Sequence, residues 1–83
     1  MKTRGHALLA EWCEANDVDS AKLARLVRDA AKKLRGVRAP RRPAYTAAVR
    51  WLKGLWRPQY DTRLAIEEAT DGYVPVTAWE ELP

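Results

Sequence analysis

The chain has 83 residues, of which 47% are hydrophobic and 31% charged, and its formal net charge at pH 7 is +4. This length allows a single domain spanning residues 1–83, and no apolar run approaches the roughly 18 to 20 residues that a membrane-spanning helix requires. The apolar stretch 7–10 is interrupted by Glu11 before it reaches the length of a signal peptide. We therefore expect a cytoplasmic protein with no membrane partner.

The first two predicted helices follow from apolar spacing. Apolar residues recur every three or four positions over residues 6–15, which indicates a first helix. The same spacing predicts a longer amphipathic helix over residues 21–35. Its start offers a capping oxygen on Asp19 or Ser20, and Gly36 is placed to end it.

A connector at residues 37–42 separates the second helix from a third. Proline is well tolerated at the first helical position because its missing N–H would have no partner there, so the third helix is predicted to begin at Pro43 or Ala44. Gly54 lies close to its end, and Pro58 prevents continuation. One face carries Tyr45, Ala48, Trp51, Leu52 and Leu55, and the opposite face carries or adjoins Thr46, Val49, Arg50, Lys53 and Arg57.

A fourth helix is predicted around the apolar positions within residues 64–69, with Asp61 or Thr62 as its cap. The tail, residues 72–83, contains Pro75 and alternates too little for a strand inside a sheet, so we expect an extended segment or an edge strand. The pattern predicts an all-α fold: a small bundle of four to five helices with a short extended C-terminal tail.

Charge is segregated along the chain. Residues 28–57 contain ten basic residues and one acid, Asp29, and are net +9, whereas the remainder is net −5. A basic block of this density favours a polyanionic partner that neutralises it. A solvated basic face with no partner is the alternative.

Groups for catalysis or metal binding are scarce. Cys13 is the only cysteine and His6 the only histidine, so the chain forms no internal disulfide and offers no Cys/His cluster. We expect Cys13 to be a small buried helix residue and His6 to lie in a mobile start. No nucleophile has a base at a recognisable spacing. We expect no enzymatic activity, no cofactor, no metal and no small-molecule substrate.

The C-terminal half contains a series of residues and short motifs at specific spacings. Trp51 is followed by Gly54, then by Pro58, then by LAIEEAT at 64–70 and VPVTAW at 74–79. In this order and spacing, the chain resembles Cro and lambda-repressor-like helix-turn-helix regulators of phages and bacteria. The resemblance implies a DNA-binding transcriptional regulator, a repressor that acts as a homodimer, with each third helix in a major groove of a near-palindromic site.

The N-terminal side resembles the same family more loosely, through LAEW at 9–12 and SAKLAR at 20–25. The middle departs from it. In the family, a short turn joins the two helices of the motif. The separation between Leu23 and Trp51 is roughly fourteen residues longer than the separation between the corresponding positions of family members. The resemblance therefore implies a variant helix-turn-helix with an insertion within residues 28–42, most of whose charged residues are basic.

The predicted DNA contacts combine phosphate binding with base readout. Lys and Arg side chains on DNA release condensed counterions, whereas sequence is read by side chains on the leading turns of a helix in the major groove. We expect Arg50 to bond a guanine edge, Thr46 to contact a base or a phosphate, and Ala47 to touch a thymine methyl. The predicted set is Ser20, Arg38, Arg41, Arg42, Ala44, Tyr45, Thr46, Ala47, Arg50, Lys53 and Arg57.

Several of these residues have a second interpretation. Tyr45 shares the apolar stripe and is either a core residue or a base contact. Ser20 is either a plain N-cap, which we favour, or a phosphate anchor at the helix N-terminus. Arg41 and Arg42 suit phosphate clamping better than entry into a minor groove.

The tryptophans and the tail also have alternatives. We expect the three tryptophans at 12, 51 and 56 to be core residues rather than platforms for stacked bases. Trp79 either covers the core or packs on a second subunit. The residues predicted for dimerisation are Tyr73, Val74, Val76 and Trp79.

Two other functions compete with the DNA-binding regulator. A non-specific DNA- or RNA-binding protein uses the same basic block without base readout. An adaptor docks an acidic protein partner through the basic helix. The only support for this function in the sequence is the positive charge.

Overall fold

The computed structural model describes residues 2–34 and 44–82. Within this part of the chain there are four α-helices, one 3-10 helix and no strand. The predicted all-α fold, a small bundle of helices, is confirmed.

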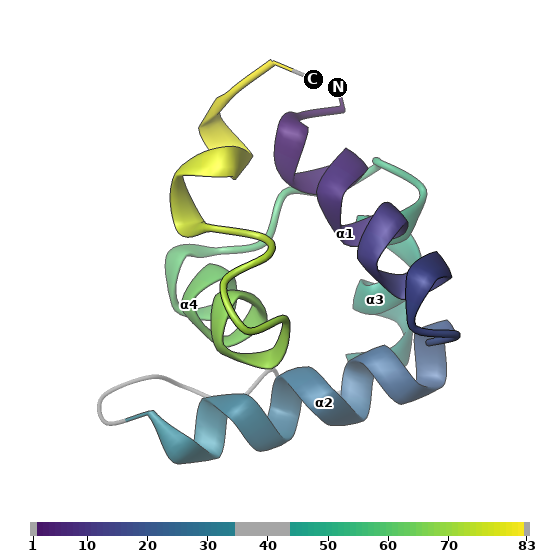
Figure 1. Cartoon of the computed structure of the whole chain (residues 1–83), viewed down its shortest axis with the longest axis vertical. Helices are drawn as coiled ribbons and strands as arrows, with labels where there is room; N and C mark the ends of the chain where they lie inside the picture. The colour runs from purple at the N-terminus through teal and green to yellow at the C-terminus, as the bar shows by residue number, and fades with distance from the viewer. Residues whose placement is uncertain (1, 35–43, 83) are drawn as a thin grey trace.

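Helix α2 (Ser20–Lys33) is the central element of the fold. It packs against both α3 (Ala44–Leu52) and α4 (Tyr60–Ala69). The 3-10 helix η1 (Val76–Glu80) packs against α1 (Arg4–Ala15) and α4, and α1 also contacts α3. Figure 1 shows α2 running beneath the other helices, with the N- and C-terminal segments side by side at the far end of the molecule.

The predicted amphipathic pattern of α2 is confirmed. Its buried residues lie on one face at helical spacing, and each Leu or Val buried in this way stabilises the fold by about 1.5 to 3 kcal/mol. Asp19 caps the helix, because its carboxylate accepts a hydrogen bond from the backbone N–H of Lys22 at 2.8 Å. The buried residues of α2 are Leu23, Ala24, Val27, Ala30 and Ala31.

Three helices end in the same motif. The residue after the cap is left-handed at Asp17 (φ 55°), Gly54 (φ 76°) and Asp71 (φ 54°). In each case the next N–H reaches back five residues to a carbonyl of the last turn, which satisfies groups that the helix leaves unpaired. These bonds are Val18 to Cys13 at 2.8 Å, Leu55 to Arg50 at 2.9 Å and Gly72 to Glu67 at 2.8 Å.

Several predicted boundaries are wrong by one to three residues. Helix α1 begins at Arg4 rather than residue 6, and α2 ends at Lys33, since Leu34 is already extended. Helix α4 begins at Tyr60 behind Gln59, so neither Asp61 nor Thr62 caps it. Both lie within the first turn instead, where the Asp61 charge suits the helix dipole. The predicted end cap, Gly36, lies outside the described residues, as does Pro43.

The prediction of an extended tail or edge strand is wrong for part of the tail. Residues Val76–Glu80 form η1, and Val74, Ala78 and Trp79 are fully buried in the core. Thr70 helps to fold the tail back, because its hydroxyl donates to the carbonyl of Ile66 and accepts from the N–H of Val74. The tail therefore completes the core of a single chain.

No helix among residues 2–34 and 44–82 is both long enough and apolar enough to cross a membrane.

Candidate nucleic-acid interface

Helix α3 has two distinct faces. Ala48 and Trp51 are buried, with exposed fractions of 0% and 4%, so the predicted inward position of Trp51 is confirmed. Arg50 is partly exposed and Lys53, just beyond the helix, is exposed. The burial of Trp51 in the core, on a helix that packs against α2, fixes which side of α3 faces solvent.

The two basic residues of this outer face are not neutralised by the described part of the chain. No carboxylate within residues 2–34 and 44–82 pairs with Arg50 or Lys53, whereas Arg4, Arg57 and Arg63 all have such partners. Uncompensated cations on one helix face favour a partner with negative charge.

The guanidinium of Arg50 lies on the indole of Trp56. Its Cζ is 4.1 Å from the centroid of the ring, which is the geometry of a cation–π contact. Trp56 is 48% exposed, so the prediction that it is a core residue is wrong. Its position follows from the motif at Gly54, which turns the chain back toward α3.

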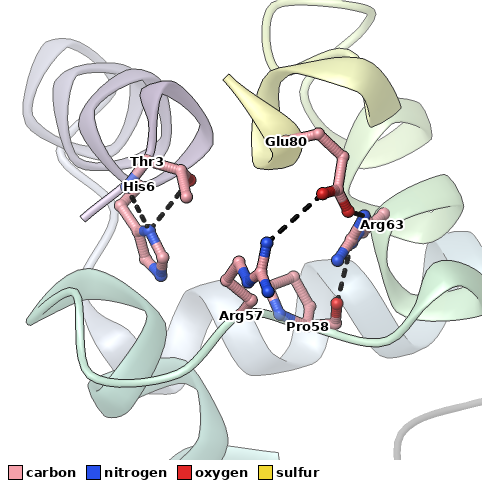
Figure 2. A network of polar contacts seen from close by, with 6 residues as sticks. All are labelled: Thr3, His6, Arg57, Pro58, Arg63 and Glu80. Carbon is pink, nitrogen blue, oxygen red and sulfur yellow. Dashed lines mark hydrogen bonds and ion pairs between the residues drawn. The ribbon is translucent and has the colours of Figure 1, made fainter. Parts of the chain in front are cut away.

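A buried histidine fixes the loop that carries Trp56. His6 is 2% exposed and its Nε2 hydrogen-bonds the backbone carbonyl of Trp56. Its Nδ1 accepts a hydrogen bond from the backbone N–H of Thr3 at 2.9 Å (Figure 2). Because Nδ1 accepts, Nε2 carries the proton and donates to the carbonyl.

The expectation that His6 lies in a mobile start is therefore wrong. Its ring packs edge-on against the indole of Trp79, with the centroids 5.0 Å apart and the planes at 82°. This role was not predicted, although the spacing of Thr3 and His6 is that of a capping box with histidine in the place of the usual Glu or Gln.

A carboxylate from η1 connects the same loop to α4. Glu80 binds Arg57 at 3.3 Å and Arg63 at 2.6 Å, and Arg63 also donates from Nε to the carbonyl of Pro58 at 2.8 Å (Figure 2). The pKa of Glu80 is lowered, chiefly by the hydrogen bond from Arg63 and next by the positive charge of Arg63. Arg57, predicted to bind phosphate, is thus already paired with an acid of its own chain.

The other predicted DNA contacts fall in several places. Thr46 and Ala47 lie on α3 and are partly buried, and Ala44 and Tyr45 form the start of that helix. Ser20 is the first residue of α2, and since Asp19 is the cap, the favoured interpretation of Ser20 as N-cap is wrong. The predicted arm residues Arg38, Arg41 and Arg42 lie outside the described residues.

The predicted dimerisation residues need correction. Val74 and Trp79 are fully buried within one chain and are not available to a second subunit. Tyr73 is 43% exposed and donates from its hydroxyl to Glu11 at 2.7 Å, and Val76 is partly buried. A dimer interface built on Val74 and Trp79 is therefore wrong, because these side chains form the core.

Cys13 is buried among apolar residues of the core, as predicted. Burial raises the pKa of its thiol to about 11, so the thiol is protonated at neutral pH and is a poor nucleophile. Among the described residues, no three His, Cys, Asp or Glu side chains gather as metal ligands.

Comparison with known proteins does not identify a family. No protein-family model matches the chain, and neither a curated protein nor a solved structure matches it. The resemblance to Cro and lambda-repressor-like regulators stays a prediction from the residues quoted above.

Proposed function

We propose that the protein binds double-stranded DNA in a sequence-specific manner and regulates transcription, with α3 entering the major groove. The observation that carries this proposal is the division of α3 into a buried face with Trp51 and an outer face whose cations, Arg50 and Lys53, have no acidic partner among the described residues. Repression by occluding a promoter is the simplest consequence of such binding.

The dimensions of α3 suit this role. The helix has 9 residues, and at about 1.5 Å per residue it is roughly 13 Å long. A B-DNA major groove is about 12 Å wide and admits a single α-helix. The basic residues of the preceding segment, 35–43, add positive charge directly before the helix.

Each outward residue of α3 has a distinct expected role. Arg50 offers the planar fork of donors that pairs with O6 and N7 of guanine. Thr46 contacts a base or a phosphate, and Lys53 binds a phosphate as a point charge. Arg57 contributes less than its charge suggests, because Glu80 competes for it.

Two copies of the protein on a near-palindromic site remain part of the proposal. Helix-turn-helix dimers place their recognition helices one helical turn of DNA apart. Because Val74 and Trp79 are buried in the core, contact between the two copies has to use residues on the surface instead. Analytical ultracentrifugation with and without the selected duplex measures the stoichiometry.

The proposal is tested by selecting duplexes from a random pool and measuring their affinity by fluorescence anisotropy. The wild-type protein should prefer a selected duplex over a scrambled one. Arg50→Ala should reduce this preference by about 1 to 3 kcal/mol, because a bidentate contact to one base is lost. Arg4→Ala removes the same charge from the place where the two termini meet and should leave the preference unchanged.

Equal affinity of the wild-type protein for all duplexes would contradict the regulator and favour the second candidate, a non-specific nucleic-acid binder. One observation supports that alternative: Trp56 is an exposed aromatic ring beside a cation, a combination on which unpaired bases stack. Titration with single-stranded DNA and RNA in parallel distinguishes the two. A binder of this kind prefers single strands and responds to salt but not to sequence.

A further inference from the structure

The contact between Arg50 and Trp56 joins the outer face of α3 to the loop that follows it. The Arg50 guanidinium covers the indole at 4.1 Å from its centroid. A cation over the face of an indole is attracted to the ring, and a guanidinium carries five N–H donors, more than one ring engages. Donors that are not directed at the ring therefore stay available for a base edge.

The loop that carries the indole is held by several independent contacts, although the Trp56 side chain itself is 48% exposed. Leu55, the residue before it, donates its N–H to the carbonyl of Arg50 at 2.9 Å, which closes the end of α3. The carbonyl of Trp56 is bound by the buried ring of His6. Arg57, the residue after it, is paired with Glu80. The loop around Trp56 is therefore tied through its backbone to α3 and α1, and through the Arg57 side chain to η1.

We infer that Trp56 is a positioning residue for Arg50: its indole orients the guanidinium for base readout, and Trp56 thereby determines sequence preference without contacting a base. This inference rests on the proposed function. A free arginine loses rotamer freedom when it binds a base edge, and an arginine that is already stacked loses less. Trp56 thus acts through Arg50 and not through a contact of its own with the DNA.

The test is a double-mutant cycle on the selected duplex and a scrambled control. Trp56→Ala should lower the preference for the selected duplex by about two- to fivefold, the range expected for an exposed cation–π contact. Trp56→Phe keeps an aromatic face and should retain most of the preference. Leu55→Ala, a change at the neighbouring residue, which is 65% exposed, should have no effect. In the Arg50→Ala background, Trp56→Ala should cost nothing further.

A second readout needs no DNA. The side-chain protons of Arg50 should show a ring-current shift in the NMR spectrum of the free protein, and Trp56→Ala should abolish it. All variants keep the backbone carbonyl that His6 binds, so the loop retains that contact.

The failures are distinguishable. If the wild-type protein selects a duplex but Arg50→Ala and Trp56→Ala act additively, or if the ring-current shift is absent, the role of Trp56 is wrong and the DNA-binding function stands. If the wild-type protein prefers no duplex, the proposed function fails and the positioning role fails with it.

Discussion

Gly5 shows how a single missing side chain decides the packing of the tail. A Cβ atom at this position would overlap the indole of Trp79, and even its distance to Cε3 of the ring would be only 2.7 Å, well inside the contact distance of two carbon atoms. The glycine therefore lets the indole lie directly against the backbone of α1. Glycine within a helix costs about 1 kcal/mol relative to alanine, and here the close approach of Trp79 offsets that cost.

We expect Gly5→Ala to destabilise the protein by about 1 to 3 kcal/mol, because the added methyl overpacks a site filled by a rigid ring. The free energy of unfolding is measured by urea denaturation followed by tryptophan fluorescence. Ala10→Gly, at an exposed position of the same helix, measures only the difference in helix propensity between alanine and glycine and should lower the free energy of unfolding by about 1 kcal/mol. A Gly5→Ala protein as stable as wild type would show that Trp79 does not lie against Gly5.

At the scale of elements, Glu80 links η1 to α4 and to the loop after α3. Its partners Arg57 and Arg63 come from different parts of the chain, and the Glu80 side chain is 60% exposed. Exposed ion pairs contribute little individually, so this carboxylate orients the elements more than it stabilises them.

The lowered pKa of Glu80 gives this link a pH dependence. A carboxyl group whose pKa is lower in the folded chain than in the unfolded chain stabilises the fold above the unfolded pKa, and this contribution is lost as the pH falls through the folded pKa. We expect Glu80→Gln to be less stable than wild type at pH 7 and equal to it at acid pH where Glu80 is protonated. Thermal unfolding across this pH range measures the difference.

Glu68→Gln is the matched control for Glu80. Glu68 is exposed on α4, and no cation within the described residues pairs with it. It should show no comparable pH-dependent difference from wild type. A difference between Glu80→Gln and wild type that persists unchanged into acid would contradict the linkage.

The elements also show what the sequence can predict. The buried face of α2 and the burial of Ala48 and Trp51 on α3 follow from local periodicity. Leu55 is predicted to lie on the same apolar face but is 65% exposed, because α3 ends at Leu52. Periodicity reports which face of a helix is apolar, and it does not report which segment covers that face. The tail has no periodicity, so the pattern leaves open whether Trp79 covers the core or packs on a second subunit, and the structure shows that it covers the core.

The candidate site is divided in the same way. The outward position of Arg50 and Lys53 is local and was predicted, since both lie opposite the apolar stripe of α3. The partners of Trp56 and Arg57 were not predicted, because His6 is 50 residues from Trp56 and Glu80 is 23 residues from Arg57. Such contacts depend on tertiary packing. The Arg50–Trp56 contact had a partial signal in Gly54, which turns the chain back between them.

For the molecule as a whole, the tail contributes a large share of a small core. Val74, Ala78 and Trp79 have exposed fractions of 0%, and Trp79 packs against two residues of α1, the backbone of Gly5 and the ring of His6. A buried tryptophan hides about 150 to 250 Å², which at about 25 cal/mol per Å² stabilises the fold by roughly 4 to 6 kcal/mol. Its indole N–H has no partner among the described residues, which costs about 1 to 3 kcal/mol of that gain.

Deleting residues 73–83 should therefore unfold the chain. At about 0.05 to 0.15 kcal/mol per residue, a chain of 83 residues has a total stability of roughly 4 to 12 kcal/mol. The loss of Trp79 and its neighbours is of the same size, so we expect helical circular dichroism and cooperative thermal unfolding to disappear. Deleting only residues 82–83 removes Leu82, which is 77% exposed, and should leave both signals intact. A truncated chain that unfolds cooperatively at the wild-type temperature, and differs only in weaker self-association, would instead restore the tail as a dimerisation segment.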